Sequence, residues 1–214
     1  MNQYAKQIVA YMELRGFKLF RNQGEINIIY VEGADLDGKP NSDAPDRFND
    51  LGLLLRFNEA GEPEIIHRAV CTTEPGILAT FSVNALRLGG VARIQLTQYL
   101  ERWKIGWHKK ADHPALVQCA PVLVHRDRNR DFIRTRDPIM PATGINHHGT
   151  RPGYVAKFVG MFSAGCSVRL HWEEQLEFIN LLKTDPRYQA DADFKFSATY
   201  LDGGKVAALP TFSV

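Results

Sequence analysis

The stretch GINHHGTRPGYVAKFVGMFSAGCSVRL, residues 144–170, carries the pattern that best predicts the fold and chemistry of this chain. Residues 144–149 have the composition of a short strand that turns at a glycine. Residues 163–165, Ser-Ala-Gly, place small side chains directly before Cys166. A reactive cysteine needs a base, amide donors for an oxyanion and a turn that exposes its sulfur. This stretch contains candidates for all three.

The residues themselves predict a thiol–imidazole pair. Cys166 is the candidate nucleophile, and His148 stands 18 residues upstream as the candidate base. Two strand ends of one sheet could bring these side chains together. Gly165 permits a tight turn, and the amides of Gly165 and Cys166 could point at an oxyanion.

These residues also resemble the signature of the L,D-transpeptidases. That signature is a strand ending in His-Gly or His-Ser, a loop of about fifteen residues, and Ser/Thr-His-Gly-Cys. The matching positions cover about 30 residues and are His148-Gly149-Thr150, Ser163-x-Gly165-Cys166 and the following Arg169.

The resemblance implies a mostly β catalytic domain that acts on the stem peptides of peptidoglycan. Cys166 would attack a peptide carbonyl, and His148 would accept the thiol proton and later protonate the leaving amine. The carbonyl of Gly149 would orient the imidazole in place of a third triad residue. The amides of Ala164, Gly165 and Cys166 would form the oxyanion hole. The acyl group would then pass to an amine or to water, and both outcomes stay open.

This chain departs from the family pattern at two positions. Ala164 stands where the family usually has histidine. The family's Arg or Asn commonly lies two residues after the cysteine, where this chain has Val168, and Arg169 comes one residue later. On a strand, that offset puts the side chain on the opposite face. The candidate substrate-binding residues are Ser163, Tyr154, Arg169 and His147. Structural roles are the alternative, since His147 points away from His148 on a regular strand and Tyr154 could pack onto the domain.

The remaining pattern predicts a mainly β domain with a few helices, an α+β fold of the L,D-transpeptidase-like β-sheet type. Apolar periodicity favours helices at 3–15 and 171–184. Strands are expected at 26–33, 50–58, 64–73, 103–108, 115–126 and 194–201, with a turn at 202–204 into a last short strand. No boundary is evident, so residues 1–214 are predicted to form a single domain, with the catalytic motif region at about 101–214 and a helix and strands at about 1–100.

Composition excludes several classes of protein. With 44% hydrophobic and 23% charged residues and a net charge of +2, the chain is too weakly basic to indicate nucleic acid as a partner. No apolar run approaches the roughly 18 residues of a membrane span, so membrane insertion is not expected. The first twenty residues lack the apolar core of a secretory signal. We therefore expect synthesis in the cytoplasm and action in the periplasm or cell wall after release or delivery, as for a phage lysis protein or a secreted effector.

The other candidate ligands and thiols have structural interpretations. Cys71 and Cys119 are predicted to be buried structural thiols. A zinc site from His147, His148, Cys166 and His171 was weighed, but adjacent histidines on a strand diverge, so neither metal nor cofactor is predicted. Residues 127–131 lack the glycine of a calcium loop and favour a charged turn. Trp103, Trp107 and His108 lie near one another and suit either a glycan platform or the core.

A second functional hypothesis belongs to a different class. Ala164 and the displaced Arg169 would suit a non-catalytic wall-binding or phage structural module that keeps the fold after losing part of its site. Reactivity of the Cys166 thiol separates the two, because an activated thiol has a depressed pKa. The sequence carries no indication of oligomeric state.

Overall fold

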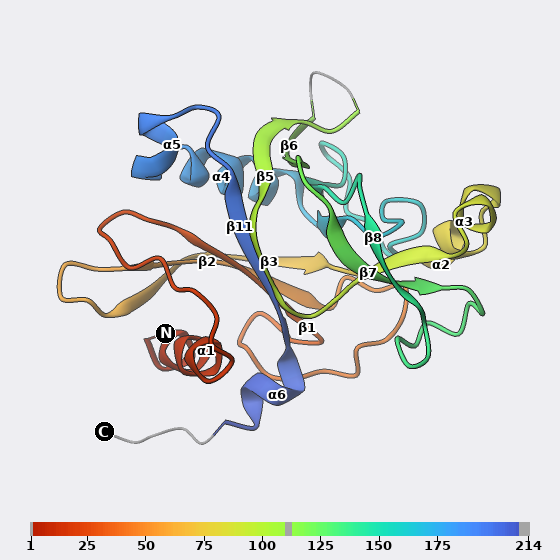
Figure 1. Ribbon diagram of the computed structural model, residues 1–214, viewed down its shortest axis with the longest axis horizontal. Coiled ribbons are helices and arrows are strands. Elements are labelled where there is room, and N and C mark those ends of the chain that lie inside the picture. The colour runs from red at the N-terminus through yellow and green to blue at the C-terminus, as the bar shows by residue number, and fades with distance from the viewer. Residues whose placement is uncertain (1, 110–112, 210–214) are drawn as a thin grey trace.

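The protein is mainly β with a few helices, as predicted. The computed structural model describes residues 2–109 and 113–209 (Figure 1). Eight strands form a closed barrel in the order β1-β11-β5-β6-β9-β10-β3-β2. Their bounds are β1 (Asn27–Glu32), β2 (Asp50–Phe57), β3 (Pro63–Thr72), β5 (Gln98–Trp107), β6 (Pro114–Gln118), β9 (His147–Gly149), β10 (Ser167–Arg169) and β11 (Phe196–Asp202).

A second, three-stranded sheet and six helices surround this barrel within the described residues. The small sheet has the order β4-β7-β8, from β4 (Val91–Ile94), β7 (Val122–Asp127) and β8 (Ile139–Ala142). The helices are α1 (Asn2–Leu14), α2 (Ile77–Thr80), α3 (Val83–Arg87), α4 (Trp172–Leu182), α5 (Pro186–Ala190) and α6 (Gly203–Ala207). None of these helices has both the length and the apolar character that crossing a lipid bilayer requires.

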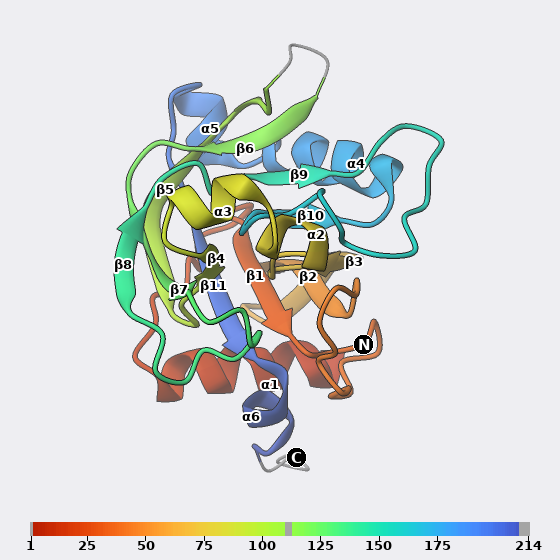
Figure 2. The same ribbon diagram turned by 90° about the vertical axis from the view of Figure 1, so that its right-hand side faces the viewer.

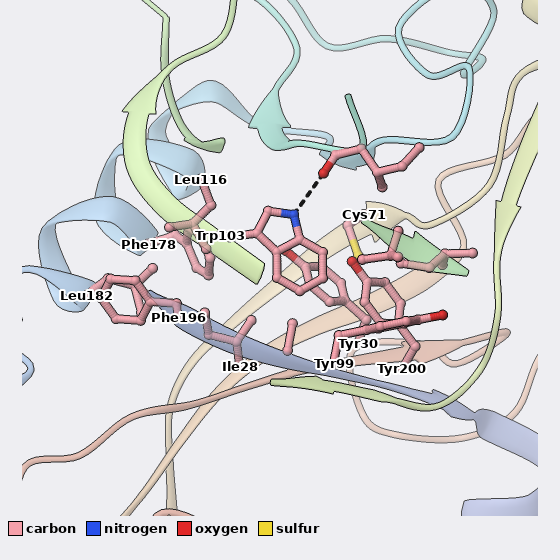
Figure 3. Packing of buried hydrophobic residues seen from close by; sticks show 14 of the residues in the cluster. Ile28, Tyr30, Cys71, Tyr99, Trp103, Leu116, Phe178, Leu182, Phe196 and Tyr200 are labelled. Atoms are coloured by element: carbon pink, nitrogen blue, oxygen red, sulfur yellow. Dashed lines mark hydrogen bonds between the residues drawn. The ribbon is translucent and has the colours of Figure 1, made fainter. Parts of the chain in front are cut away.

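Aromatic side chains fill the barrel interior (Figure 3). Trp103, Tyr30 and Tyr200 are fully buried, and the rings of Tyr30 and Tyr200 stack with centroids 5.0 Å apart. The indole nitrogen of Trp103 donates to the carbonyl of Ile145 at 2.7 Å (Figure 3). Of the two tryptophans weighed as a glycan platform, Trp103 is therefore a core residue, whereas Trp107 is exposed. The bond to Ile145 ties β5 to the chain just before β9, which positions the strand of the candidate base.

The two predicted long helices are confirmed. In α1, Ile8 and Met12 are buried against the outward face of β1 and β2, and Gly16 ends the helical segment with φ +65°. In α4, Phe178, Ile179 and Leu182 are buried against the barrel, as the 3.6-residue period predicts. The predicted strand pair β2 and β3 is confirmed as an antiparallel hairpin.

The region 115–126 is two strands, so the prediction of one strand there was wrong. β6 belongs to the barrel and β7 to the small sheet, and the chain passes between them at 119–121. Pro121 cannot donate a ladder hydrogen bond, which favours a break at this point. Cys119 therefore lies in an exposed connection, and its predicted burial was also wrong. Cys71 is buried, as expected.

Three other segments of the chain, near residues 75–92, 127–131 and 202–207, can be compared with their predictions. The predicted turn at 202–204 and the strand after it are instead the N-cap and body of the short helix α6, because the carboxylate of Asp202 accepts from the Lys205 amide. Residues 75–92, which have no clear period, form α2, α3 and β4. The charged segment 127–131 begins the connection between β7 and β8, where Asp127 accepts from the amides of Asp131 and Phe132. It is a charged turn, as expected.

Candidate active site

A buried hydrogen-bonded turn presents Cys166. The hydroxyl of Ser163 accepts from the amide of Gly165 at 3.1 Å and donates to the carbonyl of Cys166 at 2.8 Å. Gly165 has φ +137°, and a Cβ there would lie 2.6 Å from the carbonyl oxygen of Ala92. Only glycine fits this backbone and this contact. Ser163 is fully buried in the turn, which leaves none of its side chain for a substrate.

The thiol of Cys166 is half-buried and hydrogen-bonded to the chain that enters β9. The amide of Asn146 lies 3.4 Å from the sulfur, and the thiol lies 3.5 Å from the carbonyl oxygen of Gly144. Burial raises the pKa of the Cys166 thiol, and the Asn146 amide and the charge of Lys109 oppose that shift. Cys166 is therefore a neutral thiol at pH 7.

His148 lies on β9, beside the strand that begins directly after Cys166. β9 and β10 pair in parallel, with His148 opposite Val168 and His147 opposite Ser167. The Nδ1 atom of His148 lies 2.8 Å from the carbonyl oxygen of Gly149. A carbonyl only accepts, so Nδ1 carries the proton and Nε2 keeps its lone pair. The hydrogen bond that the resemblance implies is thus present, while the catalytic role of His148 stays a prediction.

The environment keeps this imidazole neutral. Burial lowers the pKa of His148 to about 3, and the neighbouring His108 adds to the effect. Nε2 is buried and has no hydrogen-bond partner in the described part of the chain. A buried acceptor without a partner is costly, and Nδ1 of His147 is in the same condition, so this atom alone does not single out His148.

Two further histidines, His108 and His113, surround His148. The ring of His108 stacks on that of His148 with centroids 3.9 Å apart and an interplanar angle of 16°. His113 lies edge-on to His148 at 5.3 Å, and its Nε2 atom is 3.1 Å from the carbonyl oxygen of Gly149. Both come from the β5–β6 hairpin. Their sequence positions lack motif spacing, so only knowledge of the β6–β9 pairing could have found them.

Asn146 fixes the position and tautomer of His108. The side-chain oxygen of Asn146 accepts from the amide of Gln118 at 3.0 Å, so its NH₂ group points to Nδ1 of His108, also at 3.0 Å. His108 therefore accepts at Nδ1 and carries its proton on Nε2. Burial lowers its pKa to about 4, so it too is neutral at pH 7.

A cavity of about 410 Å³ opens on these histidines. Trp172 and Phe162 contribute aromatic walls, and Lys109 and Arg151 contribute positive charge. Its size suits a short peptide or a similar small ligand. Cys166 lies outside the set of residues that line it, so the cavity meets the imidazole and not the sulfur.

His147 and Arg169 face the barrel interior. Nε2 of His147 lies 2.9 Å from the hydroxyl of Tyr200, and Arg169 donates to the side-chain oxygen of Gln175 at 3.0 Å. Both side chains are fully buried, and the Arg169 guanidinium lies 3.4 Å from the ring centroid of Phe178. Strand alternation explains this placement, because residues opposite each other on β9 and β10 share a face. Neither side chain reaches the cavity.

The remaining predicted residues lie nearer the surface. Tyr154 is exposed in the loop after β9 and stacks on Phe162, a cavity residue, with centroids 6.0 Å apart. The Gly165 amide is occupied by Ser163, which removes it from the expected oxyanion hole. The amides of Ala164 and Cys166 donate to no acceptor within the described residues, so these two donors stay available.

One carboxylate group outside this site has the spacing for a metal ion. Glu32, Asp43 and Glu74 bring ligand oxygens within 4.8 Å of one another. Arg134 makes a bidentate pair with Glu32, and Arg93 pairs with Glu74. The two guanidiniums pair with Glu32 and Glu74, as in a structural ion-pair cluster, while burial and the neighbouring Glu32 raise the pKa of Asp43 to about 6.

Comparisons with protein-family models, with curated proteins and with solved structures return no match for this chain. The resemblance to the L,D-transpeptidases accordingly rests on the residues of 144–170.

Proposed function

We propose that this protein is a cysteine acyl-enzyme catalyst that acts on peptidoglycan stem peptides in the manner of an L,D-transpeptidase. One observation carries the proposal. His148 stands beside the strand that begins after Cys166, with Nδ1 fixed by the Gly149 carbonyl and a buried Nε2 left without a partner. This is the arrangement of an oriented base whose third partner is a backbone carbonyl.

The pKa shifts define how such a site would begin the reaction. Both the Cys166 thiol and the His148 imidazole are neutral at rest. Proton transfer from Sγ to Nε2 therefore accompanies attack of the sulfur on the peptide carbonyl, as for a serine nucleophile. The new C–S bond leaves the carbonyl oxygen as an oxyanion, which the amides of Ala164 and Cys166 would stabilise.

Collapse of the tetrahedral intermediate breaks the C–N bond, and the proton on His148 goes to the leaving amine. The resulting thioester then passes its acyl group to water, giving hydrolysis, or to an acceptor amine, giving transpeptidation. The acceptor transfers a proton to His148, which returns it to the thiolate. The cationic Lys109 and Arg151 in the cavity favour a peptide that carries a carboxylate.

The test is mass spectrometry of purified muropeptides incubated with the wild-type protein, with Cys166→Ala and with Cys119→Ala. Cys119 is an exposed thiol outside the site and makes the matched control. We expect loss of a terminal residue, cleavage of a cross-link or a new dimer with the wild-type protein and Cys119→Ala, and none of these with Cys166→Ala. Turnover that persists in Cys166→Ala would exclude the mechanism.

A non-catalytic wall-binding or phage structural module is the second candidate. Two observations favour it: the raised pKa of Cys166 and the position of its sulfur outside the cavity lining. Because the Cys166 thiol is neutral at rest under either candidate, turnover and not thiol labelling separates them. Binding of intact sacculi together with no change in muropeptides would support the binding module.

A further inference from the structure

A large apolar surface is exposed around α2 and α3, and one of its residues, Met161, also lines the cavity of the candidate site. Within residues 76–90, Ala79, Thr80 and Ala85 face inward, while the large side chains face outward. Five of these are between 53% and 66% exposed: Leu78, Phe81, Val83, Leu86 and Leu88. Exposed apolar residues gathered in this way usually mark an interaction site. Figure 2 shows α2 and α3 together on the face toward the viewer.

Two neighbouring loops extend this surface. The amide of Ala79 donates to the carbonyl of Gly160 at 3.2 Å, which holds the loop between β9 and β10 against α2. That loop exposes Phe158 and Met161. On the other side, the ring of Phe132 lies 6.3 Å from that of Phe81 and joins the β7–β8 connection to α2. We call the exposed apolar residues of 76–90, 128–136 and 155–161, with Arg47, Arg128, Arg130 and Lys157, the apolar–basic surface.

Cations accompany the apolar side chains at short range. The guanidinium carbon of Arg130 lies 5.3 Å from the ring centroid of Phe81. Arg47 lies 4.4 Å and Lys157 5.4 Å from the ring centroid of Phe158. Arg128 and Arg130 also border a hollow beside Leu86. Acidic residues are sparse, since Asp131 is the single acid within 76–90, 128–136 and 155–161. The surface is thus apolar and positively charged together.

We propose that the apolar–basic surface docks the protein on an anionic lipid bilayer. Apolar side chains flanked by arginines suit the bilayer interface, where they enter the boundary of the acyl chains while guanidiniums pair with lipid phosphates. Charge complementarity selects this occupant, because a second copy of the chain would bring the same cations into contact. The binding is peripheral, in keeping with short helices that lie on the surface. It does not depend on the proposed catalytic function.

The first experiment is co-sedimentation of the full chain with vesicles. Vesicles of equal parts phosphatidylglycerol and phosphatidylcholine should carry the protein into the pellet at about 0.1 M salt, where screening is moderate. Vesicles of phosphatidylcholine alone should carry at least about tenfold less, because the electrostatic attraction is missing. Equal binding to both vesicles, or binding to neither, would overturn the proposal.

Two double variants separate the apolar and electrostatic contributions. Arg128→Gln with Arg130→Gln should weaken partitioning into the anionic vesicles by about fivefold for each arginine. Leu78→Ser with Leu86→Ser should weaken it by about tenfold or more. Leu14→Ser is the matched control, since this leucine is 70% exposed at the end of α1 and outside the surface.

Folding and self-association are monitored in the same samples. All variants should keep the thermal unfolding midpoint of the wild-type protein within a few degrees, because the altered side chains are exposed. Gel filtration at the same concentrations reports the alternative occupant. A dimer in the wild type that disappears in Leu78→Ser with Leu86→Ser, without lipid binding, would assign the surface to self-association and overturn the proposal.

Discussion

The two faces of the β9–β10 strand pair carry the same kinds of residue in opposite surroundings, one face in the barrel core and the other at the candidate site. On the inner face, His147 and Arg169 are held by Tyr200 and Gln175. On the outer face, His148 lines the cavity with an unpartnered Nε2, and the turn at Gly165 leads to Cys166 just before β10. Nδ1 of His147 is also unpartnered, so the two histidines differ in that His148 opens on the cavity and His147 on the core. Strand alternation alone decides which neighbour takes which role.

Substitution of Cys166 at the candidate site should change the activity, whereas substitution on the inner face should not. Cys166→Ala should lower muropeptide turnover by at least about a thousandfold, because the nucleophile is lost and no other thiol reaches the site. Its unfolding midpoint should stay close to that of the wild type, since the thiol is only half-buried. Turnover and calorimetry on the same preparation check both. A large loss of stability in Cys166→Ala would remove the contrast between the faces.

The inner face should show the reverse behaviour. Arg169→Ala should lower the free energy of unfolding by about 3 kcal/mol, because it leaves the Gln175 side-chain oxygen without its donor and a void beside Phe178. Turnover per folded molecule should be unchanged. Urea unfolding followed by fluorescence measures the effect, and Arg169→Met, which fills the void, should recover part of it. A fall in turnover per folded molecule would mean that Arg169 acts on the substrate.

The periodicity of apolar residues predicted the helices and the hairpin, whose formation depends on residues close together in the sequence. The 3.6-residue period identified α1 and α4, and the two apolar runs before residue 75 identified the β2–β3 hairpin. These elements need no knowledge of distant contacts. The one-residue offset left the orientation of Arg169 open, and Arg169 stood among the candidate substrate-binding residues, whereas the structure buries it in the barrel interior.

The parts that local pattern missed depend on pairing between distant segments. The barrel closes through parallel pairing of β1 with β11, which lie about 170 residues apart in the chain. His108 and His113 reach His148 because β6 pairs with β9 through Leu116 and His147, and nothing in the sequence of a hairpin specifies that neighbour. Cys119 was misplaced for the opposite reason, since a continuous apolar run concealed the break at Pro121.

Burial of the neutral His148 imidazole should make the folded protein less stable in acid. The folded-state pKa of His148 is lowered to about 3 from 6.5, so the unfolded chain binds its proton first, and this contribution to stability is lost as pH falls from 6.5 toward 3. His148→Asn removes this titration and keeps an NH donor for the Gly149 carbonyl. Relative to wild type, the variant should gain about 2 kcal/mol at pH ~4.5 compared with pH ~7.5. Urea unfolding at both pH values measures the gain, and an equal difference at both would contradict the shift.

The smallest expected effect lies in the stacked pair of outer-face histidines. His108→Phe keeps a ring over His148 but removes a group that, when protonated, lowers the pKa of His148. The acid limb of kcat/KM should therefore move to higher pH, with a change of less than about tenfold at neutral pH. Trp107→Phe, an exposed aromatic change next to it in the chain, should leave the profile unmoved. An acid limb that stays in place in His108→Phe would show that the stack is structural, and one that moves to lower pH would show that His108 supports protonation of His148.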